Sequence, residues 1–326
     1  MSKIASKTRS DSYLASNLTE FGHIPVLPSE VQALLQPKKG DVLVDLTAGR
    51  GGHAFALAEA AGPGATLVLF DLDEKNLTFA TDRVLSLGVK VIPVHANFAT
   101  AASKMEELGL RADCILADLG FASNQMDNPD RGLSFRGDGP LDMRLNPESG
   151  TTAADIIRTT NESDLADLIY HLGEEPYSRR IAQKIVQERT KEPILTTVRL
   201  AQIVREAYGA RARTSRLHPA TRTFMALRIA VNDELSALDA LLADVETGGR
   251  KVDEGGWLNH GARIAVISFH SLEDRRVKQS FVALEKNGLA KRLTRKPARA
   301  SEEEIASNTR SRPAKLRAVT LLPEDD

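Results

Sequence analysis

The segment Val42–Ala61, VLVDLTAGRGGHAFALAEAA, decides the fold class. Its first four residues are an apolar run that ends on Asp45, which is the pattern of a short buried strand. A glycine-rich turn, Gly49-Arg50-Gly51-Gly52, comes next and is followed by a helical stretch from Ala54 to Ala61. The order strand, glycine turn and helix is typical of a unit that adds a strand to a parallel sheet.

The same alternation continues along the chain. Further strands are predicted at Thr66–Asp71, Val89–Val94 and 113–118, with helices near 74–87 and 99–108 between them. Pro93 weakens the pattern of the third strand. Strands and helices that alternate at this spacing predict an α/β fold with a Rossmann-like, doubly wound sheet.

A helical block interrupts the strand pattern. Amphipathic helices are predicted at Ala153–Ile157, Asp164–His171 and Tyr177–Arg189, and a longer helix at about 219–245. The strand pattern returns at Arg263–Phe269, so the helices are inserted into the sheet domain rather than appended to it. We therefore expect one domain from residues 21–124 and 216–326, an inserted helical substrate-recognition domain at 125–215, and a disordered tail at 1–20.

The composition indicates a protein of a reducing compartment. Cys114 is the only cysteine among 326 residues, which excludes an intrachain disulfide and a cysteine-based zinc site. Residues 1–20 are polar and lack the apolar core of a signal peptide. No apolar run approaches the roughly 18 residues that a membrane span needs. The expected location is the cytoplasm, away from membranes.

The net charge of −1 conceals two basic segments. Residues 205–228 carry six arginines against one glutamate, and residues 286–317 carry ten lysines or arginines against three glutamates. Basic segments on an otherwise acidic chain indicate contact with a polyanion such as a nucleic acid. A solvated surface that balances its own charge explains the charge pattern equally well.

The segment Cys114–Asn146, CILADLGFASNQMDNPDRGLSFRGDGPLDMRLN, is the candidate reaction centre. A short apolar run ends on Asp118, and about 25 residues rich in Gly, Pro, Asp, Asn and Arg follow without a helical or strand period. A compact domain seldom holds so long a loop unless the loop binds something. Ligands of open α/β sheets bind beyond the carboxyl ends of the strands, which is where Asp118 is expected.

The glycine turn and a distant acid predict a nucleotide-type cofactor. Gly49, Gly51 and Gly52 let the backbone approach a ligand, and the helix start offers N–H donors. Asp71, 20 residues beyond Gly51, can accept hydrogen bonds from ribose hydroxyls. The spacing Gly49-x-Gly51-x-x-Ala54 fits NAD as well as S-adenosylmethionine, so the glycines leave both cofactors open.

Two residues near the glycine turn and the strand ends are ambiguous. His53 could be a packed residue, a cofactor contact or a general base, and contact with the cofactor is the favoured interpretation. Phe98 follows the third strand, where a core position and stacking on an adenine fit the pattern equally well.

Nine short strings occur in one order over roughly residues 22–318. They are HIPVL (23–27), TAGRGGH (47–53), DLG (118–120), DRGLSF (130–135), GPLDMR (139–144), GEE (173–175), HPATRTF (218–224), ISFHSLEDR (267–275) and AKLR (314–317). Together they resemble the bacterial 16S ribosomal RNA cytosine-N4 methyltransferase family, known as RsmH or MraW. The resemblance implies the fold of a class I S-adenosylmethionine-dependent methyltransferase.

The resemblance also implies a reaction and its partners. The family methylates the exocyclic N4 of a decoding-centre cytidine in 16S ribosomal RNA, which the small ribosomal subunit presents, and this favours S-adenosylmethionine over NAD. The implied cofactor contacts are Gly49, Gly51, Gly52, His53, Asp71, Phe98, Asp118 and Gln125. The residues expected to contact RNA are Phe121, Ser123, Arg131, Phe135, Arg144, His218 and Arg222. A homodimer is compatible with this picture, and the reaction needs no metal.

Asp118 is expected to carry the chemistry. It or a neighbouring backbone carbonyl would accept a hydrogen of the cytosine N4, while a purely cofactor-binding role is the competing hypothesis. Phe121 could stack on an extruded base. The family usually has Val-Ser-Ser after the DLG string, whereas this chain has Phe121 and Ala122, so the details of base binding stay open.

Several charged residues also have ordinary structural interpretations. The arginines that could bind phosphate are Arg131, Arg136, Arg144, Arg216, Arg222 and Arg228, and acids in the same loop could pair with them instead. Ser271 is predicted to cap a helix with Asp274 as its partner, and Glu174-Glu175 before Arg179-Arg180 predicts a helix start. The alternative functions are an NAD-dependent oxidoreductase and a non-catalytic RNA-binding protein.

Overall fold

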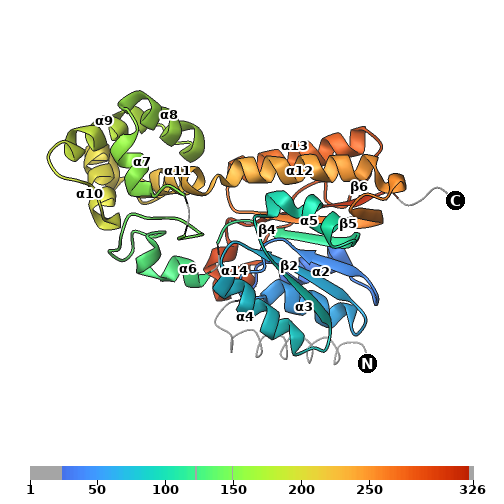
Figure 1. Cartoon of the computed structure of the whole chain (residues 1–326). Coiled ribbons are helices and arrows are strands. Elements are labelled where there is room, and N and C mark those ends of the chain that lie inside the picture. Colours follow the sequence, from blue (N-terminus) through green and yellow to red (C-terminus); the bar gives the residue numbers. More distant parts are fainter. Residues whose placement is uncertain (1–23, 122, 149, 323–326) are drawn as a thin grey trace. The chain divides into compact units, whose positions relative to one another are not determined.

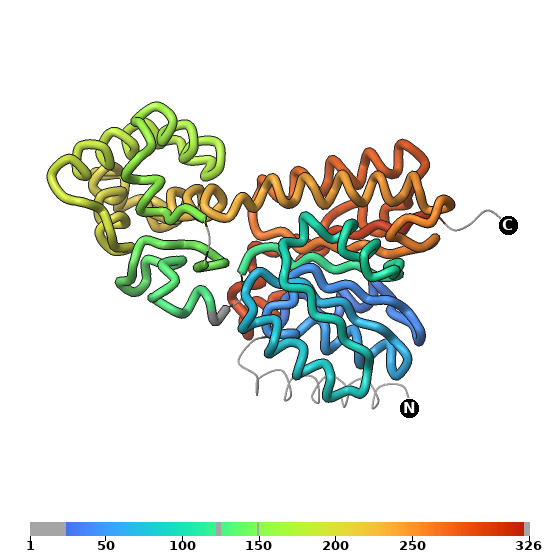
Figure 2. The backbone as a smooth tube through the Cα atoms, viewed as in Figure 1, coloured from blue at the N-terminus to red at the C-terminus, as the bar shows by residue number. Residues whose placement is uncertain are grey.

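The computed structural model describes residues 24–121, 123–148 and 150–322, drawn as a cartoon in Figure 1 and as a backbone tube in Figure 2. The chain divides into two compact units. The helical unit is Phe121–Leu235, and the sheet unit consists of the residues up to Gly120 and from Ser236 onwards. The predicted tail at 1–20 lies outside the described residues. Within the described ranges, no helix has the length and apolar character that crossing a membrane requires.

A sheet of seven strands forms the centre of the sheet unit. The strands are β1 (Val42–Asp45), β2 (Thr66–Asp71), β3 (Lys90–His95), β4 (Ala112–Asp118), β5 (Leu258–Ser268), β6 (Ala290–Arg292) and β7 (Lys315–Leu321). Their order is β3-β2-β1-β4-β5-β7-β6, with β1 to β5 parallel and β7 antiparallel to both of its neighbours. The predicted Rossmann-like, doubly wound sheet is confirmed, and Pro93 lies in the edge strand β3.

Helices cover both faces of this sheet (Figure 1). They are α2 (Pro28–Leu35), α3 (Gly52–Ala61), α4 (Glu74–Leu85), α5 (Ala101–Glu107), α12 (Glu234–Arg250), α13 (Ser271–Lys286) and α14 (Glu302–Ser307), with single turns η1 (Phe98–Thr100), η4 (Val252–Glu254) and η5 (Thr309–Ser311). Successive strand residues point to opposite faces. Leu43 therefore packs in the core beside α2, α3 and α4, and Val44 packs in the core beside α5, α12 and α13.

The strand order places the ends of β1 and β4 side by side. From β1 the chain builds outward to β3 and then returns to β4 on the other side of β1. In doubly wound sheets, ligands bind at the carboxyl ends of the strands where the order reverses in this way. Asp45 ends β1 in register with Leu116, two residues before Asp118 ends β4. The fold therefore brings the glycine turn after β1 and the acid of β4 to one edge.

The helical unit has its own apolar core. Its elements are α6 (Ser123–Asp127), η2 (Pro129–Arg131), α7 (Ala153–Thr159), α8 (Glu162–Gly173), α9 (Ser178–Arg189), α10 (Thr197–Tyr208), η3 (Gly209–Arg213) and α11 (Ala220–Asn232). Leu165 and Ile169 of α8, Ile181 of α9 and Val204 of α10 are buried in this core. The helices between Phe121 and Leu235 thus form a separately packed body.

The boundaries of the helical unit differ from those predicted. It extends to Leu235 rather than to 215, because the apolar side of α11 (Phe224 and Leu227) is buried in the helical core. The single helix predicted at about 219–245 is wrong. Asp233, in a left-handed conformation with φ +50°, separates α11 from α12. The apolar spacing continues across this one residue, so the break leaves no trace in the hydrophobic pattern.

Candidate active site

The glycine turn after β1 is shaped by the rest of the sheet unit. Gly49 and Gly51 have positive φ angles of +50° and +72°, which favour glycine. A Cβ on Gly51 would lie 3.0 Å from Cα of Ala80 in α4, and one on Gly52 would lie 3.3 Å from the Pro25 ring. Close packing within the protein therefore favours glycine at these positions, and the close approach of a ligand remains a prediction.

Asp71 at the end of β2 holds the glycine turn. Its Oδ2 accepts a hydrogen bond of 2.8 Å from the Gly49 N–H, and its Oδ1 accepts one of 2.8 Å from the Asp73 N–H. Burial raises the pKa of Asp71 to about 6, although these two N–H donors oppose the rise. Each carboxylate oxygen can accept a second hydrogen bond, so the residue remains suited to ribose hydroxyls.

Asp45 and Thr47 join β1 to β4, and neither was predicted as a site residue. The Asp45 carboxyl, 3% exposed, accepts a hydrogen bond of 3.1 Å from the Thr47 N–H. The Thr47 hydroxyl accepts one of 2.7 Å from the Asp118 N–H. Burial raises the pKa of Asp45 to about 7, with Thr47 opposing the rise and Asp71 adding to it. The signal was available, since Asp45 also ends a strand and Thr47 belongs to the TAGRGGH string.

Asp118 lies where its carboxyl can meet a ligand at the edge of the sheet. Its Oδ2 is 3.6 Å from Nε2 of His53, which is 6% exposed. Its Oδ1 is buried and has no hydrogen-bond partner among the described residues. Burial raises the pKa of Asp118 well above its usual range, and the charges of Asp45 and Glu273 add to this. Burial therefore favours the protonated form of this carboxyl, and a positive charge nearby would favour the ionised form.

Phe98 has a mixed environment. It begins the turn η1 directly after β3, where the Asn97 side chain accepts a hydrogen bond of 2.9 Å from the Ala99 N–H. The Phe98 ring is half-buried and packs against the core beside α5. Part of the ring remains accessible, so both predicted interpretations stay open.

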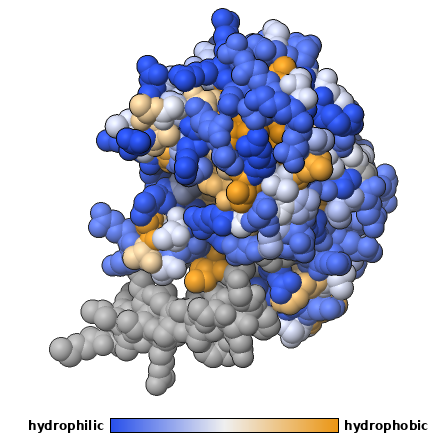
Figure 3. Space-filling view, turned by 90° about the vertical axis from the view of Figure 1, so that its left-hand side faces the viewer, coloured by the Kyte–Doolittle hydropathy of each residue, from blue (hydrophilic) through white to orange (hydrophobic). Residues whose placement is uncertain are grey.

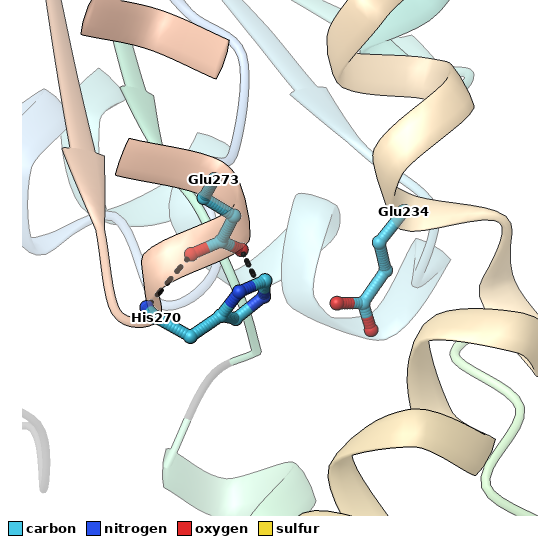
Figure 4. A group of neighbouring side chains, drawn as sticks. All are labelled: Glu234, His270 and Glu273. Carbon is cyan, nitrogen blue, oxygen red and sulfur yellow. Dashed lines mark hydrogen bonds and ion pairs between the residues drawn. The ribbon is translucent and has the colours of Figure 1, made fainter. Parts of the chain in front are cut away.

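The start of α13 differs from the prediction, which placed Ser271 as the cap and Asp274 as its partner. The cap residue is His270 and its partner is Glu273 (Figure 4). The Glu273 carboxylate accepts hydrogen bonds of 2.8 and 3.2 Å from the N–H groups of Phe269 and His270, and lies 3.2 Å from His270 Nε2. Asp274 instead pairs with Lys315 and Arg317. The charge of Glu273 adds to the rise in the pKa of Asp118, so Glu273 is a neighbour of the candidate site, and the sequence did not predict it there.

Two of the predicted RNA contacts meet in the helical unit. The rings of Phe135 and His218 are stacked, with centroids 4.5 Å apart and an angle of 25°, and Phe224 meets Phe135 edge-on at 4.9 Å. His218 Nδ1 accepts a hydrogen bond of 3.2 Å from the Ala220 N–H. Burial, together with the charge of Arg205, lowers the pKa of His218. The stack is therefore an uncharged aromatic surface at neutral pH.

Other predicted RNA contacts already have partners within the helical unit. Arg144 makes two hydrogen bonds of 2.7 Å to Asp142. The guanidinium of Arg228 lies 4.6 Å from the Phe121 ring centroid and is held by Glu234 at 2.8 Å. The salt-bridge interpretation therefore applies to both arginines.

The remaining predicted residues of the helical unit are placed less decisively. Arg131 donates a hydrogen bond of 3.1 Å to the Leu145 carbonyl. Gln125 is buried in α6, and Arg222 is half-buried on α11. Ser123 begins α6, and its side chain lies outside the described part of the chain.

The buried carboxyl of Asp45 predicts a pH dependence of stability. The folded protein keeps this proton up to about pH 7, whereas the unfolded chain loses it near its ordinary pKa of 3.8. The stabilisation is present below that ordinary pKa and is lost as the pH rises to about 7. In Asp45→Asn we expect this pH-dependent loss in the free energy of unfolding to be smaller by roughly 1 kcal/mol or more, since one pKa unit corresponds to about 1.4 kcal/mol.

The measurement is urea unfolding at a series of pH values, followed by the fluorescence of Trp257, the only tryptophan of the chain and a buried residue of the sheet unit. Asp239→Asn is the control, because Asp239 is exposed on α12. An unchanged slope in Asp45→Asn would contradict the assignment.

Comparisons of the sequence with known proteins indicate one family. A family model described as the MraW methylase family matches residues 20–322. The ribosomal RNA small subunit methyltransferase H of Geotalea uraniireducens is 43% identical over 318 residues, covering 93% of this chain and 99% of the relative. That of a Cyanothece species is 45% identical over 303 residues, covering 93% and 96%. A solved rRNA methylase from Streptococcus thermophilus covers 90% of this chain and 95% of its own, with 10% identity and a TM-score of 0.39.

Proposed function

This chain belongs to the MraW methylase family, and from that membership we propose that it methylates N4 of a decoding-centre cytidine in 16S ribosomal RNA. S-adenosylmethionine is the methyl donor, and ribosomal RNA of the small subunit is the substrate class. The observation that supports the proposal best is the Asp118 carboxyl, whose Oδ1 is buried and whose Oδ2 lies 3.6 Å from His53, at the edge where β1 and β4 end.

The residues at this edge fit the methyl donor. Asp71 has acceptor capacity for ribose hydroxyls, and the start of α3 at Gly52 offers backbone donors. The buried Asp118 Oδ1 needs a polar partner, because an unsatisfied buried oxygen is unfavourable. When bound, S-adenosylmethionine supplies an electrophilic methyl group on a positively charged sulfur. Gly49, Gly51, His53 and Phe98 complete the proposed contacts, and Gln125 is proposed from the helical unit.

Positioning is the first task of the protein in this reaction. The cytosine N4 is a poor nucleophile because its lone pair is delocalised into the ring. Alignment of two reactants can supply up to about 7–11 kcal/mol of the barrier. The chain of hydrogen bonds from Asp45 through Thr47 to the Asp118 backbone fixes the end of β4 against the glycine turn. This rigid edge is suited to hold both reactants in line.

Removal of a proton from N4 is the second task. Asp118 in its protonated form can accept a hydrogen bond from N4 but cannot take the proton. The ionised form can do both, and a proton acceptor contributes roughly 10²–10⁴-fold to a rate. His53, 3.6 Å from the carboxyl, favours the ionised form when it carries a proton. A neighbouring backbone carbonyl is the alternative acceptor.

The helical unit is proposed to bind the RNA. The Phe135–His218 stack offers an aromatic surface to an unpaired base, and Phe121 is a second ring for that purpose. Arg131, Arg222 and Ser123 are proposed as polar contacts, and Arg144 acts through its pair with Asp142. A homodimer and a cytoplasmic location remain predictions.

A labelling experiment tests this function. Small subunits from a strain that lacks the enzyme are incubated with the protein and methyl-labelled S-adenosylmethionine, and the modified nucleotide is mapped. We expect label on N4 of one cytidine in the decoding centre. Label on a uridine, or on a cytidine elsewhere, would refute the substrate assignment. RNA binding without any label would support the non-catalytic alternative, and NAD binding measured by calorimetry would support the oxidoreductase.

A further inference from the structure

A group of tyrosines and arginines lies on one part of the helical unit, which we name the tyrosine–arginine face and define as Tyr177, Arg180, Tyr208 and Arg211. The two tyrosine rings meet edge-on with centroids 4.9 Å apart. The Arg211 guanidinium lies 5.6 Å from the Tyr177 ring centroid. Arg180 Nη2 lies 3.5 Å from the place that a Cβ on Gly209 would take, beside Tyr208. The group joins the start of α9, the end of α10 and the turn η3.

A buried carboxylate, that of Glu175, supports this face from the interior of the helical unit. Glu175 is fully buried and accepts hydrogen bonds of 2.7 Å from the Tyr208 hydroxyl and 2.9 Å from the Tyr177 N–H. This corrects the prediction that Glu174-Glu175 begins a helix, since Glu174 ends α8 in a left-handed conformation and α9 begins at Ser178. One oxygen of this buried acid thus holds the Tyr208 ring through its hydroxyl, and the other holds the Tyr177 backbone through its N–H.

The arginines of this face differ from others in the helical unit. Arg158, Arg199 and Arg228 each pair with a carboxylate at 2.8 or 2.9 Å. By contrast, Arg180 and Arg211 are exposed and form no ion pair with any carboxylate in the part of the chain that the structure describes. Their charges are therefore available to a partner.

The side of the helical unit where α9 and α10 lie is largely hydrophilic. Figure 3 looks onto the side of the molecule where α9 and α10 lie in Figure 1, and blue, hydrophilic residues dominate the view. The face overlaps the basic segment 205–228, which carries six arginines against one glutamate. These features fit a polyanion better than an apolar partner.

We propose that the tyrosine–arginine face binds the phosphate backbone of a single-stranded segment of the ribosomal RNA substrate, with Tyr177 stacking on an unpaired base. Planar guanidinium groups bind phosphate through two parallel hydrogen bonds, and aromatic rings beside arginines are the usual means of holding splayed RNA bases. This role rests on the proposed function and adds residues that none of the nine sequence strings contains, apart from Glu175 beneath them.

The test compares two double variants of the full chain. Arg180→Gln/Arg211→Gln removes two unpaired charges of the face, and Arg158→Gln/Lys191→Gln removes two exposed charges that are already paired with Asp155 and Glu188. Binding to naked 16S ribosomal RNA is measured over a range of salt concentrations. We expect the first variant to bind about tenfold more weakly and to lose roughly 1.4 from the slope of log affinity against log salt, about 0.7 for each phosphate contact. The control should match the wild type.

Further measurements separate the outcomes. Tyr177→Leu should weaken binding and leave the salt slope unchanged, because stacking carries no charge. In methyl transfer to small subunits, Arg180→Gln/Arg211→Gln should raise the substrate concentration that gives the half-maximal rate about tenfold. Equal losses of RNA affinity in the two double variants, or an unchanged salt slope in the first, would overturn the proposal.

A loss of affinity seen with assembled small subunits and absent with naked RNA would assign the face to an acidic ribosomal protein instead. A wild-type protein that neither binds nor methylates small ribosomal subunits would refute the proposed function itself.

Discussion

The Asp118→Asn variant should transfer methyl groups about 10²- to 10⁴-fold more slowly than the wild type while it binds S-adenosylmethionine with similar affinity. The asparagine keeps the shape of the side chain and the backbone hydrogen bond to the Thr47 hydroxyl, so the edge of the sheet stays in place. It cannot accept the proton that leaves the cytosine N4. The measurement is single-turnover methyl transfer, combined with calorimetry of cofactor binding.

The pH dependence of the rate gives an independent check on Asp118. Burial raises the pKa of its carboxyl well above the usual range, with Asp45 and Glu273 adding to the rise. If the ionised carboxylate takes the proton, the wild-type rate rises with pH until Asp118 is ionised, and Asp118→Asn lacks this rise. Asp71→Asn is the comparison, because it removes a neighbouring carboxylate that should affect cofactor affinity and leave the rise intact. An Asp118→Asn enzyme with a normal rate would leave only the cofactor-contact role.

The Asp274→Asn variant should lose about 3 kcal/mol from the free energy of unfolding of the sheet unit. Asp274 on α13 accepts hydrogen bonds of 2.7 Å from Arg317 and 3.1 Å from Lys315, both on β7. The Arg317 side chain is only 8% exposed, so the substitution leaves a buried positive charge without its partner. Urea unfolding followed by Trp257 fluorescence measures the loss.

An exposed pair of the same type provides the control for Asp274. Asp239 on α12 lies 3.0 Å from Arg276 of α13, and its side chain is 55% exposed. Asp239→Asn should therefore lose less than about 1 kcal/mol. Similar losses in the two variants would show that burial of Arg317 is not the cause of the effect.

The effect of Asp274→Asn should also depend on pH. Burial alone would raise the pKa of Asp274, but hydrogen bonds from Arg317 and Lys315 hold it below its ordinary value of 3.8. A group whose pKa is lower in the folded state stabilises the protein above its ordinary pKa. This stabilisation is lost as the pH falls through the folded-state pKa. The difference between wild type and variant should thus be constant near neutrality and shrink below about pH 4.

Much of the sheet unit was predictable from local patterns. Apolar runs that end on Asp45, Asp71 and Asp118 gave the positions of β1, β2 and β4, because a strand buried on both faces needs a continuous apolar run. The order of strand, glycine turn and helix gave the edge where the candidate site lies. These features depend on neighbours in the sequence, so a single sequence is enough to reveal them.

Other features depend on contacts between distant residues. The break at Asp233 depends on one left-handed residue, and the extent of the helical unit depends on where α11 finds an apolar core. The cap of α13 was misplaced by one residue, because Ser271 and Asp274 fit the capping pattern as well as His270 and Glu273 do. Only the fold shows that Asp274 is engaged by β7 and so is unavailable as a cap.

The sequence by itself determined the fold class, the family and the acids that end the central strands, since these follow from hydrophobic periodicity and from strings of neighbouring residues. The tertiary structure alone decided which acids share an environment and which arginines are paired. Asp45 and Asp118 are 73 positions apart in the sequence, yet the charge of Asp45 raises the pKa of Asp118. Glu175 and Tyr208 are 33 positions apart, yet they share a hydrogen bond. Burial and distance set the charge of such groups, and neither can be read from residues that are far apart along the chain.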